Sequence, residues 1–483
     1  TKASYIFGQL AKESDFRLYG STIIDYYGPS GDLIVPEKIQ GKAVAAIGDN
    51  VFKNKNLTSV SLPKTVIKIG DYAFSGNDLD FVDAQSVSYI GISAFAGNSR
   101  LSNTKFGKVN YIGASAFENC NMSQDSISLS AVSEIGQKAF INCNFTKISN
   151  ADKLTAIGAS AFENNDLFTM ELPYVKSVGN NAFSGNKNIK SVKLNNAVSI
   201  GSKAFYNCFN LDNVALPKAE SIGADAFSNC NLAGTLSLPK VKEISDGAFS
   251  NTGVQNVSLP VCTHIGADVF KNCSSLATLE APKCEYLGNF TNNSYDFKTL
   301  DLPSLKEMNS IYSCRYLEKI NIPQCYTASD NCRITLCPQL RIFSVPLLTV
   351  LPDISYCGSL EVINLPNAVE ANEHSVSGLS NLKLLNLSAL SKTPAISNCN
   401  SLETVILSSA VSLSEIKNCG NLKNLVIPKV KSFNDSLLSG SMGSIEKLSL
   451  DSAETVTLTS DNNINYSMPK LKSLSSNNTA ELS

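Results

Sequence analysis

Hydrophobic and small residues recur in a fixed order along the first half of the chain, with a step of 21 to 23 residues. One clear copy, at residues 222–227, reads Ile-Gly-Ala-Asp-Ala-Phe. The phenylalanines that end the copies are Phe52, Phe74, Phe95, Phe117, Phe140, Phe162, Phe183, Phe205, Phe227, Phe249 and Phe270. Self-similarity at such a period predicts stacked coils, in which each repeat buries its apolar residues only against its neighbours.

A second pattern lies between the copies and predicts a short strand in each coil. Around residue 211 it reads Leu211-x-x-Val214-x-Leu216-Pro217, so that inward residues alternate with outward ones. Proline has no N–H to donate, which predicts the end of lateral pairing at Pro217. We expect Gly223 to supply backbone freedom at the turn, and Phe227 to fill the interior of the coil.

The strand pattern continues after Phe270, where the Gly-x-x-Ala-Phe turn disappears. We therefore expect about 20 coils, made mostly of strand and turn with little regular helix, and a rebuilt far side with a change of curvature near residues 285–300. The predicted parts are an aromatic-rich N-terminal cap (1–45), coils with the Ile-Gly-x-x-Ala-Phe motif (46–290), and degenerate coils with the C-terminal end (291–483). The last part is expected to be continuous with the first array.

The combined pattern Pro-x-Val-x-x-Ile-Gly-x-x-Ala-Phe-x-Asn-Cys-x-x-Leu-x-x-Val-x-Leu resembles the BspA-type (Treponema-type) leucine-rich repeat of bacterial surface proteins. The resemblance covers residues from about 33 to 285 strongly, and the remainder through its strand motif only. It implies an α/β-type repeat solenoid, a right-handed superhelix with a parallel β-sheet on its concave face. It also implies adhesion, co-aggregation or sensing at the cell surface, without enzymatic activity.

Composition narrows the function classes. Charged residues make up 17% of the chain, and the formal net charge is −2. The chain has no Lys/Arg stripe and no run of about 18 apolar residues, so we expect neither a nucleic-acid partner nor a membrane-spanning segment. Thr1 is not a natural start, so we expect that a signal peptide or anchor has been removed and that the protein is extracellular or at the cell surface.

The chain contains few of the residues and motifs that enzymes use for catalysis. The two histidines, His264 and His374, have no Ser or Cys motif partner, and the chain has no phosphate loop, nucleophile elbow or Cys-x-x-Cys pair. We therefore expect no enzyme, no catalytic residue, no metal and no cofactor. Paired carboxylates for glycoside cleavage need no sequence motif, so an accessory carbohydrate-active enzyme stays as a weaker alternative.

Most of the fourteen cysteines occupy repeated positions, after the turn Asn or in a core position. We interpret them mainly as small buried hydrophobic residues. Disulfides between adjacent coils, such as Cys120 with Cys143, are an alternative that needs closely matched Cβ directions. Cys332 and Cys337 lie off the main pattern, and they are the best candidates for a real pair.

The candidate binding residues lie on the strands of the second half, where outward positions change from short polar to apolar. They are Ile342, Val362 and Leu384 in one column, Ile406 and Val426 in the neighbouring one, and the polar rim residues Ser344, Asn364 and Asn386. An apolar patch rimmed by polar groups is typical of a binding site. A register shifted by one residue would instead bury these side chains, and a covering loop would hide them.

We therefore predict a non-catalytic recognition or adhesion scaffold that binds a protein or glycan at the cell surface through its concave face. A structural spacer that carries a removed or separate domain is the main alternative.

Overall fold

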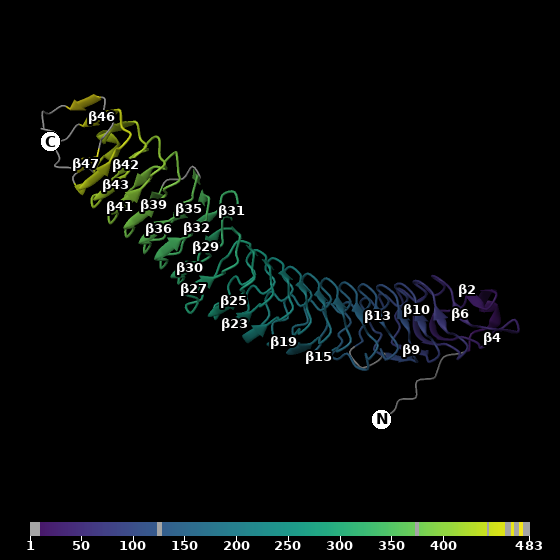
Figure 1. The fold of residues 1–483 in the computed structure, drawn as a ribbon. Helices are drawn as coiled ribbons and strands as arrows, with labels where there is room; N and C mark the ends of the chain where they lie inside the picture. The colour runs from purple at the N-terminus through teal and green to yellow at the C-terminus, as the bar shows by residue number, and fades with distance from the viewer. Residues whose placement is uncertain are drawn as a thin grey trace. The chain divides into compact units, whose positions relative to one another are not determined.

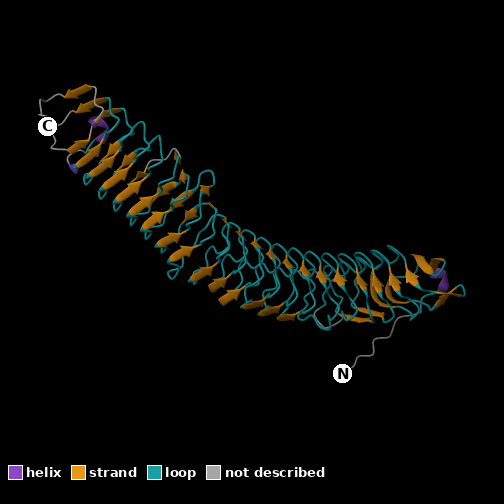
Figure 2. Cartoon of the chain, viewed as in Figure 1, coloured by secondary structure: helices purple, strands orange, loops and turns teal. Residues whose placement is uncertain are grey.

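The computed structural model describes residues 10–122, 128–371, 376–441, 444–458, 465–467 and 473–476. The chain forms two compact units (Figure 1): unit 1 contains Thr1–Ala233 and Leu238–Gly253, and unit 2 contains Gly234–Ser237 and Val254–Ser483. Each unit is a parallel β-solenoid made of strands and turns (Figure 2). The described residues make about 19 turns in all. Their helical elements include two short 3₁₀ turns, η1 (Glu13–Asp15) and η2 (Asp435–Leu438). The predicted stack of about 20 coils with little helix is confirmed.

Unit 1 begins with an antiparallel hairpin, β1 (Phe16–Tyr19) and β2 (Thr22–Tyr26), and β2 then pairs in parallel with the first coil. A second small hairpin joins β4 (Lys38–Ile39) to β5 (Lys42–Ala43). The tip of the core is aromatic, because the Tyr26 ring contacts Phe52 with centroids 5.1 Å apart. The hairpin therefore covers the first coil with an aromatic side chain.

Each coil of unit 1 contributes a two-residue parallel strand that carries the Ile or Val of the motif. These strands are β6 (Ala46–Ile47), β8 (Lys68–Ile69), β10 (Tyr89–Ile90), β12 (Tyr111–Ile112), β13 (Glu134–Ile135), β14 (Ala156–Ile157), β16 (Ser177–Val178), β18 (Ser199–Ile200), β20 (Ser221–Ile222) and β22 (Glu243–Ile244). Equivalent residues pair in register, as Ile200 does with Ile222. The inward isoleucines are buried.

A longer strand follows from the Leu-x-x-Val pattern in many coils. In unit 1 the longer strands are β3 (Gly31–Ile34), β7 (Leu57–Ser61), β9 (Phe81–Ala84), β11 (Asn103–Phe106), β15 (Thr169–Glu171), β17 (Ser191–Lys193) and β19 (Asn213–Ala215), and β21 (Ala233–Ser237) has residues in both units. They form one sheet of β3, β7, β9 and β11 and another of β15, β17 and β19. The predicted strand is confirmed in these coils, but a strand in each coil is wrong, since the described residues 143–150 contain none.

The motif phenylalanines form a continuous column of stacked rings in unit 1. From Phe52 to Phe249, neighbouring centroids lie 4.9 to 5.5 Å apart, with rings 1° to 13° from parallel. All these rings are fully buried. Burial of each ring therefore stabilises the fold through the hydrophobic effect. Each contact between neighbouring rings adds about 0.5–1.5 kcal/mol to this stabilisation.

The motif glycine is required for a different reason from the expected one. Gly223 does not have a positive φ; instead, a Cβ there would collide with the Ser202 backbone nitrogen and lie 2.6 Å from the Gly201 carbonyl carbon. Close approach of two coils thus disfavours a side chain at Gly223, although the next coil has Ser245 at the equivalent position. The left-handed positions are Asp225 (φ 53°) and Asn229 (φ 60°). The Asn229 side chain donates to Asn207 Oδ1 of the preceding coil (2.8 Å), rather than to the backbone.

A column of buried polar side chains follows the phenylalanines. Its members are Asn77, Asn98, Cys120, Cys143, Asn165, Asn186, Cys208 and Cys230, and each donates to the backbone carbonyl of the Phe in the preceding coil. Asn98 Nδ2, for example, donates to Phe74 O (3.0 Å), and Cys120 Sγ to Phe95 O (3.2 Å). Cysteine at this position therefore acts as a small buried donor that replaces asparagine.

All fourteen cysteines are buried free thiols, which confirms the main interpretation. The alternative disulfides are wrong: Cys120 and Cys143 are unpaired, and so are Cys332 and Cys337. Cys337 also belongs to the repeated column, because its thiol donates to the Ile311 carbonyl of the preceding coil (3.9 Å). The sequence did not show this equivalence, because Leu336 precedes Cys337 where other coils have an asparagine before the cysteine.

Unit 2 keeps the long strands and rebuilds the opposite side. After β23 (Gly253–Ser258) and β25 (Thr278–Glu280), the long-strand sheet of unit 2 contains β27 (Thr299–Asp301), β30 (Lys319–Asn321), β33 (Ile342–Ser344), β36 (Val362–Asn364), β39 (Leu384–Asn386), β41 (Thr404–Ile406), β43 (Asn424–Val426), β45 (Lys447–Ser449) and β47 (Asn465–Ser467). Short strands continue as β24 (His264–Ile265), β26 (Tyr286–Leu287), β28 (Glu307–Met308), β31 (Thr327–Ala328), β34 (Val350–Leu351) and β37 (Glu370–Ala371).

Where unit 1 has its Ala-Phe turn, the coils of unit 2 between residues 311 and 417 have a third strand, whereas the first coil of this unit keeps the turn at Phe270. The third strands are β29 (Ile311–Tyr312), β32 (Arg333–Thr335), β35 (Asp353–Ser355), β38 (Val376–Ser377), β40 (Ile396–Ser397) and β42 (Ile416–Lys417). The last strands, β44 (Ser432–Asn434), β46 (Thr455–Leu458) and β48 (Ser473–Ser476), instead follow the long strands at the position of the short ones and form a sheet of their own. Inward Ile334 and Ile354 replace the ring column, and β-branched residues favour extended backbone. The expected rebuilding of this side is confirmed.

Candidate functional site

The long-strand sheet of unit 2 presents the predicted site residues outward. In each strand the central residue is buried, as Phe343, Ile363 and Leu385 are, with no exposed surface. Successive side chains of a strand point to opposite faces, so the residues on either side of each central one point away from the core. The alternative of a register shifted by one residue is therefore wrong.

The pairing places the predicted residues in two columns. Ile342 pairs with Val362, and Val362 with Leu384, so that these three follow one another in successive coils. In the second column the order is Ser344, Asn364, Asn386, Ile406 and Val426. The apolar residues thus change column after Leu384, as the sequence predicted.

Solvent reaches the first column. Ile342 exposes 49% of its surface, and Val362 and Leu384 are half-buried. The second column begins as a row of hydrogen-bonded side chains, in which Asn364 Nδ2 donates to Ser344 Oγ (3.0 Å) and Asn386 Nδ2 to Asn364 Oδ1 (2.8 Å). These bonds hold the amides in place beside the apolar residues, so the rim of the patch is pre-ordered.

A third column, which sequence reasoning missed, consists of alternating charges. It contains Lys298, Glu318, Arg341, Glu361, Lys383, Glu403, Lys423 and Glu446, one from each of eight successive coils, and backbone N–H···O=C bonds connect each residue to the previous one. We call it the charge column. Each member directly follows the first hydrophobic residue of the strand motif, so a comparison of that single motif position would have found it.

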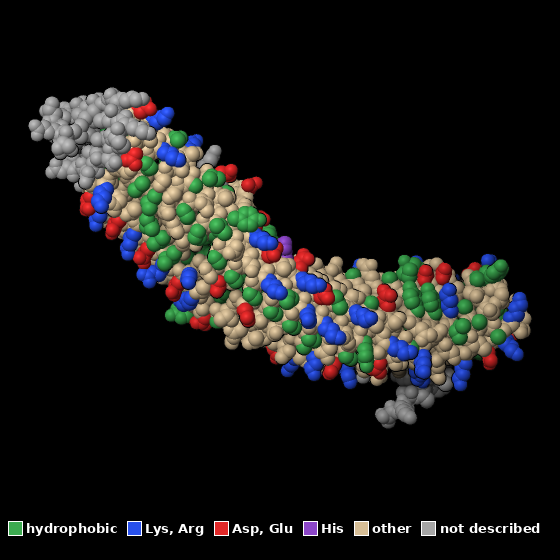
Figure 3. Space-filling view, in the orientation of Figure 1, with side chains coloured by type: hydrophobic (Ala, Val, Ile, Leu, Met, Phe, Trp, Pro, Cys, Tyr) green, Lys and Arg blue, Asp and Glu red, His purple; other side chains and the backbone are tan. Residues whose placement is uncertain are grey.

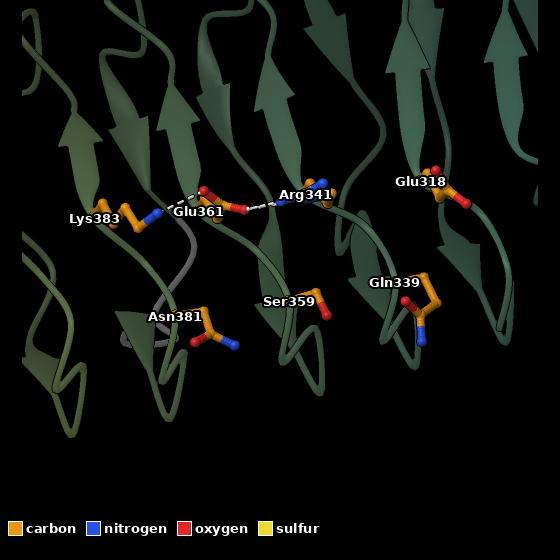
Figure 4. Close-up of a pocket in the computed structure, with 7 residues that line it drawn as sticks. All are labelled: Glu318, Gln339, Arg341, Ser359, Glu361, Asn381 and Lys383. Carbon is orange, nitrogen blue, oxygen red and sulfur yellow. Dashed lines mark hydrogen bonds and ion pairs between the residues drawn. The ribbon is translucent and has the colours of Figure 1, made fainter.

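The centre of the charge column is a connected set of ion pairs (Figure 4). Glu361 accepts from Arg341 Nη2 at 2.7 Å and from Lys383 Nζ at 2.8 Å, and Lys298 Nζ lies 3.3 Å from Glu318. The hydrogen bond from Lys383, and then that from Arg341, lowers the pKa of Glu361 below its usual range. The charges therefore neutralise one another along the column.

An open hollow of about 440 Å³ lies over these ion pairs. The residues that line it are all polar or charged: Glu318, Gln339, Arg341, Ser359, Glu361, Asn381 and Lys383. Figure 4 shows these side chains at equivalent points of successive coils. The hollow lies beside the first apolar column, since Arg341 directly precedes Ile342. Apolar, amide and charged columns thus run side by side over one sheet.

Neither histidine has a function predicted from the sequence. His264 stacks on Tyr286 with ring centroids 4.4 Å apart, and His374 lies outside the described residues. Within the described ranges, no group of three or more His, Cys, Asp or Glu side chains could hold a metal ion. None of the helices found there is long and apolar enough to span a membrane.

Comparison with known families gives a match over most of the chain. The model of the BspA type leucine rich repeat region matches residues 37–143, 110–233, 198–311, 242–353 and 353–472. No curated protein matches the chain significantly.

Several solved structures are similar. A leucine-rich repeat protein from Bacteroides ovatus is 18% identical, covers 96% of this chain and 100% of its own, and has a TM-score of 0.44. A leucine rich cell surface protein from Faecalibacterium prausnitzii is 19% identical, covers 91% and 100%, and has a TM-score of 0.29. The pneumococcal vaccine antigen PcpA is 12% identical, covers 98% and 99%, and has a TM-score of 0.24. All three TM-scores are below 0.5, so the family assignment rests on the repeat model.

Proposed function

The chain belongs to the family of BspA type leucine rich repeat proteins, and from this premise we propose that it binds another protein through the long-strand sheet of unit 2. The observation that carries this proposal is the outward apolar column Ile342, Val362 and Leu384, which lies between the amide row and the charge column. Interfaces between proteins combine an apolar centre with a polar rim in the same way.

The arrangement of charges favours a protein partner over a polyanion or an acidic glycan. Figure 3 shows positive and negative side chains following one another over unit 2. Because the charge column contains four cations and four carboxylates, it has no excess positive charge to attract a polyanion. An alternating row instead gives register and specificity to a partner with mixed charges.

We further propose that the protein acts outside the cell as a non-catalytic adhesion or recognition scaffold. The repeat provides a regular sheet, because outward residues alternate with buried ones along each strand, as Ile342 does with Phe343. Function in repeat proteins depends on the side chains that such a sheet presents.

The test is a binding array of extracellular-matrix proteins and glycans, probed with the wild type and with the triple variant Ile342→Ser, Val362→Ser, Leu384→Ser. We expect binding to a matrix protein that the triple variant loses. The matched control is Val369→Ser with Val411→Ser, which removes apolar side chains that are 54% and 59% exposed elsewhere in unit 2. Circular dichroism of all variants checks that the fold is retained.

Three outcomes contradict the proposal. Equal binding by the wild type and the triple variant would exclude the sheet face. Binding that is confined to glycans would give a different partner class. An array that is uniformly negative would favour the spacer.

A further inference from the structure

A second hollow lies in unit 2, at the corner between the third strands and the long-strand sheet. It encloses about 240 Å³ and is lined by Asn293, Ser313, Arg315, Leu336, Pro338 and Tyr356. We call it the corner hollow. It shares no residue with the sheet-face columns described above. Hydrophobic side chains gather on the visible face of this unit (Figure 3).

Two of its residues have an unfavourable backbone conformation. Leu336 and Tyr356 have φ values of 57° and 53°, in the left-handed region. Both directly precede a cysteine of the buried column, and Ser313, Gly378 and Asn398 occupy the equivalent position in neighbouring coils with φ values of 55° to 69°. Glycine and asparagine adopt this conformation readily, whereas it is strained for a bulky side chain.

Burial does not compensate for this strain. Leu336 exposes 48% of its surface and Tyr356 exposes 76%. Neither side chain therefore gains much from the hydrophobic effect within the unit. Backbone strain that brings no packing gain is typical of residues retained for function.

The corner hollow also contains a cation without a carboxylate partner. Elsewhere in unit 2, Arg341 pairs with Glu361 at 2.7 Å, and Arg333 lies 3.9 Å from Asp353. For Arg315, no carboxylate lies within ion-pair distance among the described residues. Its guanidinium remains available to an anion, and guanidinium binds carboxylates through paired hydrogen bonds.

We propose that the corner hollow binds a protein segment in which an acidic residue adjoins a large apolar or aromatic residue. Arg315 receives the carboxylate, and Leu336, Pro338 and Tyr356 contact the apolar side chain. Tyrosine and arginine are the residues that most often dominate binding energy at protein interfaces. The volume is below the roughly 300 Å³ at which ligand pockets begin, which fits one or two side chains better than a whole small ligand.

The chain contains no tryptophan, which permits a direct measurement. The probe is acetyl-Asp-Trp-amide, whose fluorescence is followed as the full chain is added, and acetyl-Asn-Trp-amide is the uncharged control. We expect saturable binding of the first peptide and about tenfold weaker binding of the second, since a hydrogen-bonded charge is lost. The substitution Arg315→Gln should weaken binding of the Asp peptide by a similar factor.

Variants at the strained positions separate binding from folding. Leu336→Asn and Tyr356→Asn introduce a residue suited to the left-handed conformation, so we expect a raised unfolding midpoint together with at least fivefold weaker binding. The triple sheet-face variant should bind the probe like the wild type, which keeps this inference independent of the proposed function. Equal binding of both peptides, no saturation, or unchanged affinity in Arg315→Gln would overturn it.

Discussion

Replacement of Asn98 tests whether the buried polar column holds the coils together. Asn98 is fully buried, and it donates to Phe95 O of its own coil (2.6 Å) and to Phe74 O of the preceding one (3.0 Å). Its Oδ1 accepts from the Leu79 N–H at 3.2 Å. One side chain thus connects three backbone groups of adjacent coils, and Asn98→Ala removes all three bonds.

The magnitude follows from what remains after the substitution. Phe74 O still accepts from Asn77 Nδ2 and Phe95 O from the Cys120 thiol, so only the Leu79 N–H loses its side-chain partner. Three bonds at about 1 kcal/mol each, with one orphaned donor, predict a loss of about 3–4 kcal/mol in the free energy of unfolding. Asn98→Cys should recover about 1 kcal/mol, because a thiol makes the equivalent bond at Cys120.

The assay is guanidinium unfolding of the wild type, both Asn98 variants and the exposed control Asn103→Ala, with midpoints compared at equal m-values. Hydrogen exchange at Leu79 gives a local readout, since its amide should lose protection in both Asn98 variants. The control should change stability by less than about 0.5 kcal/mol. If Asn98→Cys is as unstable as Asn98→Ala, thiol and amide are not interchangeable, and the account of this column is wrong.

Further predictions concern the ring column, the motif glycine, the thiols and the charge column. Phe183→Ala should cost about 3–5 kcal/mol and Phe183→Leu clearly less, as measured by unfolding; equal losses would show that volume does not matter there. Gly223→Ala should lower the free energy of unfolding by about 1–3 kcal/mol, because its methyl group enters the preceding coil; an unchanged free energy of unfolding would contradict the close approach. Burial raises the pKa of Cys120 to about 12, so at pH 8 its native thiol should resist maleimide and react after unfolding; rapid native labelling would contradict its burial. The lowered pKa of Glu361 implies a contribution to stability that is present at pH 7 and lost as the pH falls through that pKa; Glu361→Gln should remove this part of the acid dependence, and an unchanged pH profile would refute it.

The inward or outward direction of residues that recur at one position of every coil could be predicted from the sequence. The interior position of Phe227 and the outward position of Ile342 follow from periodicity, since a strand has only two faces and the core must be apolar. The reason for Gly223 could not be derived in this way. Its need for glycine arises from the backbone of a coil 21 residues earlier, and local sequence does not report that distance.

The charge column and the corner hollow were missed for related reasons. The sequence pattern identifies the inward residues and therefore the fold. It does not show which outward residues of successive coils lie next to one another. Glu361 gains meaning only beside Arg341 and Lys383, each one coil away. The strain at Tyr356 depends on a left-handed turn that the loss of Asn from the motif had concealed.

The close approach at the motif glycine also governs how this chain can change length. Gly223 lies against the coil before it, and Gly201 makes the same approach one coil earlier. A duplication or deletion of one whole repeat therefore restores every such contact, because the new neighbour has the same shape. Gain or loss of half a repeat would place larger side chains against this closely approaching backbone. The array can thus lengthen or shorten during evolution in whole-coil steps, and each added coil brings a fresh set of outward positions.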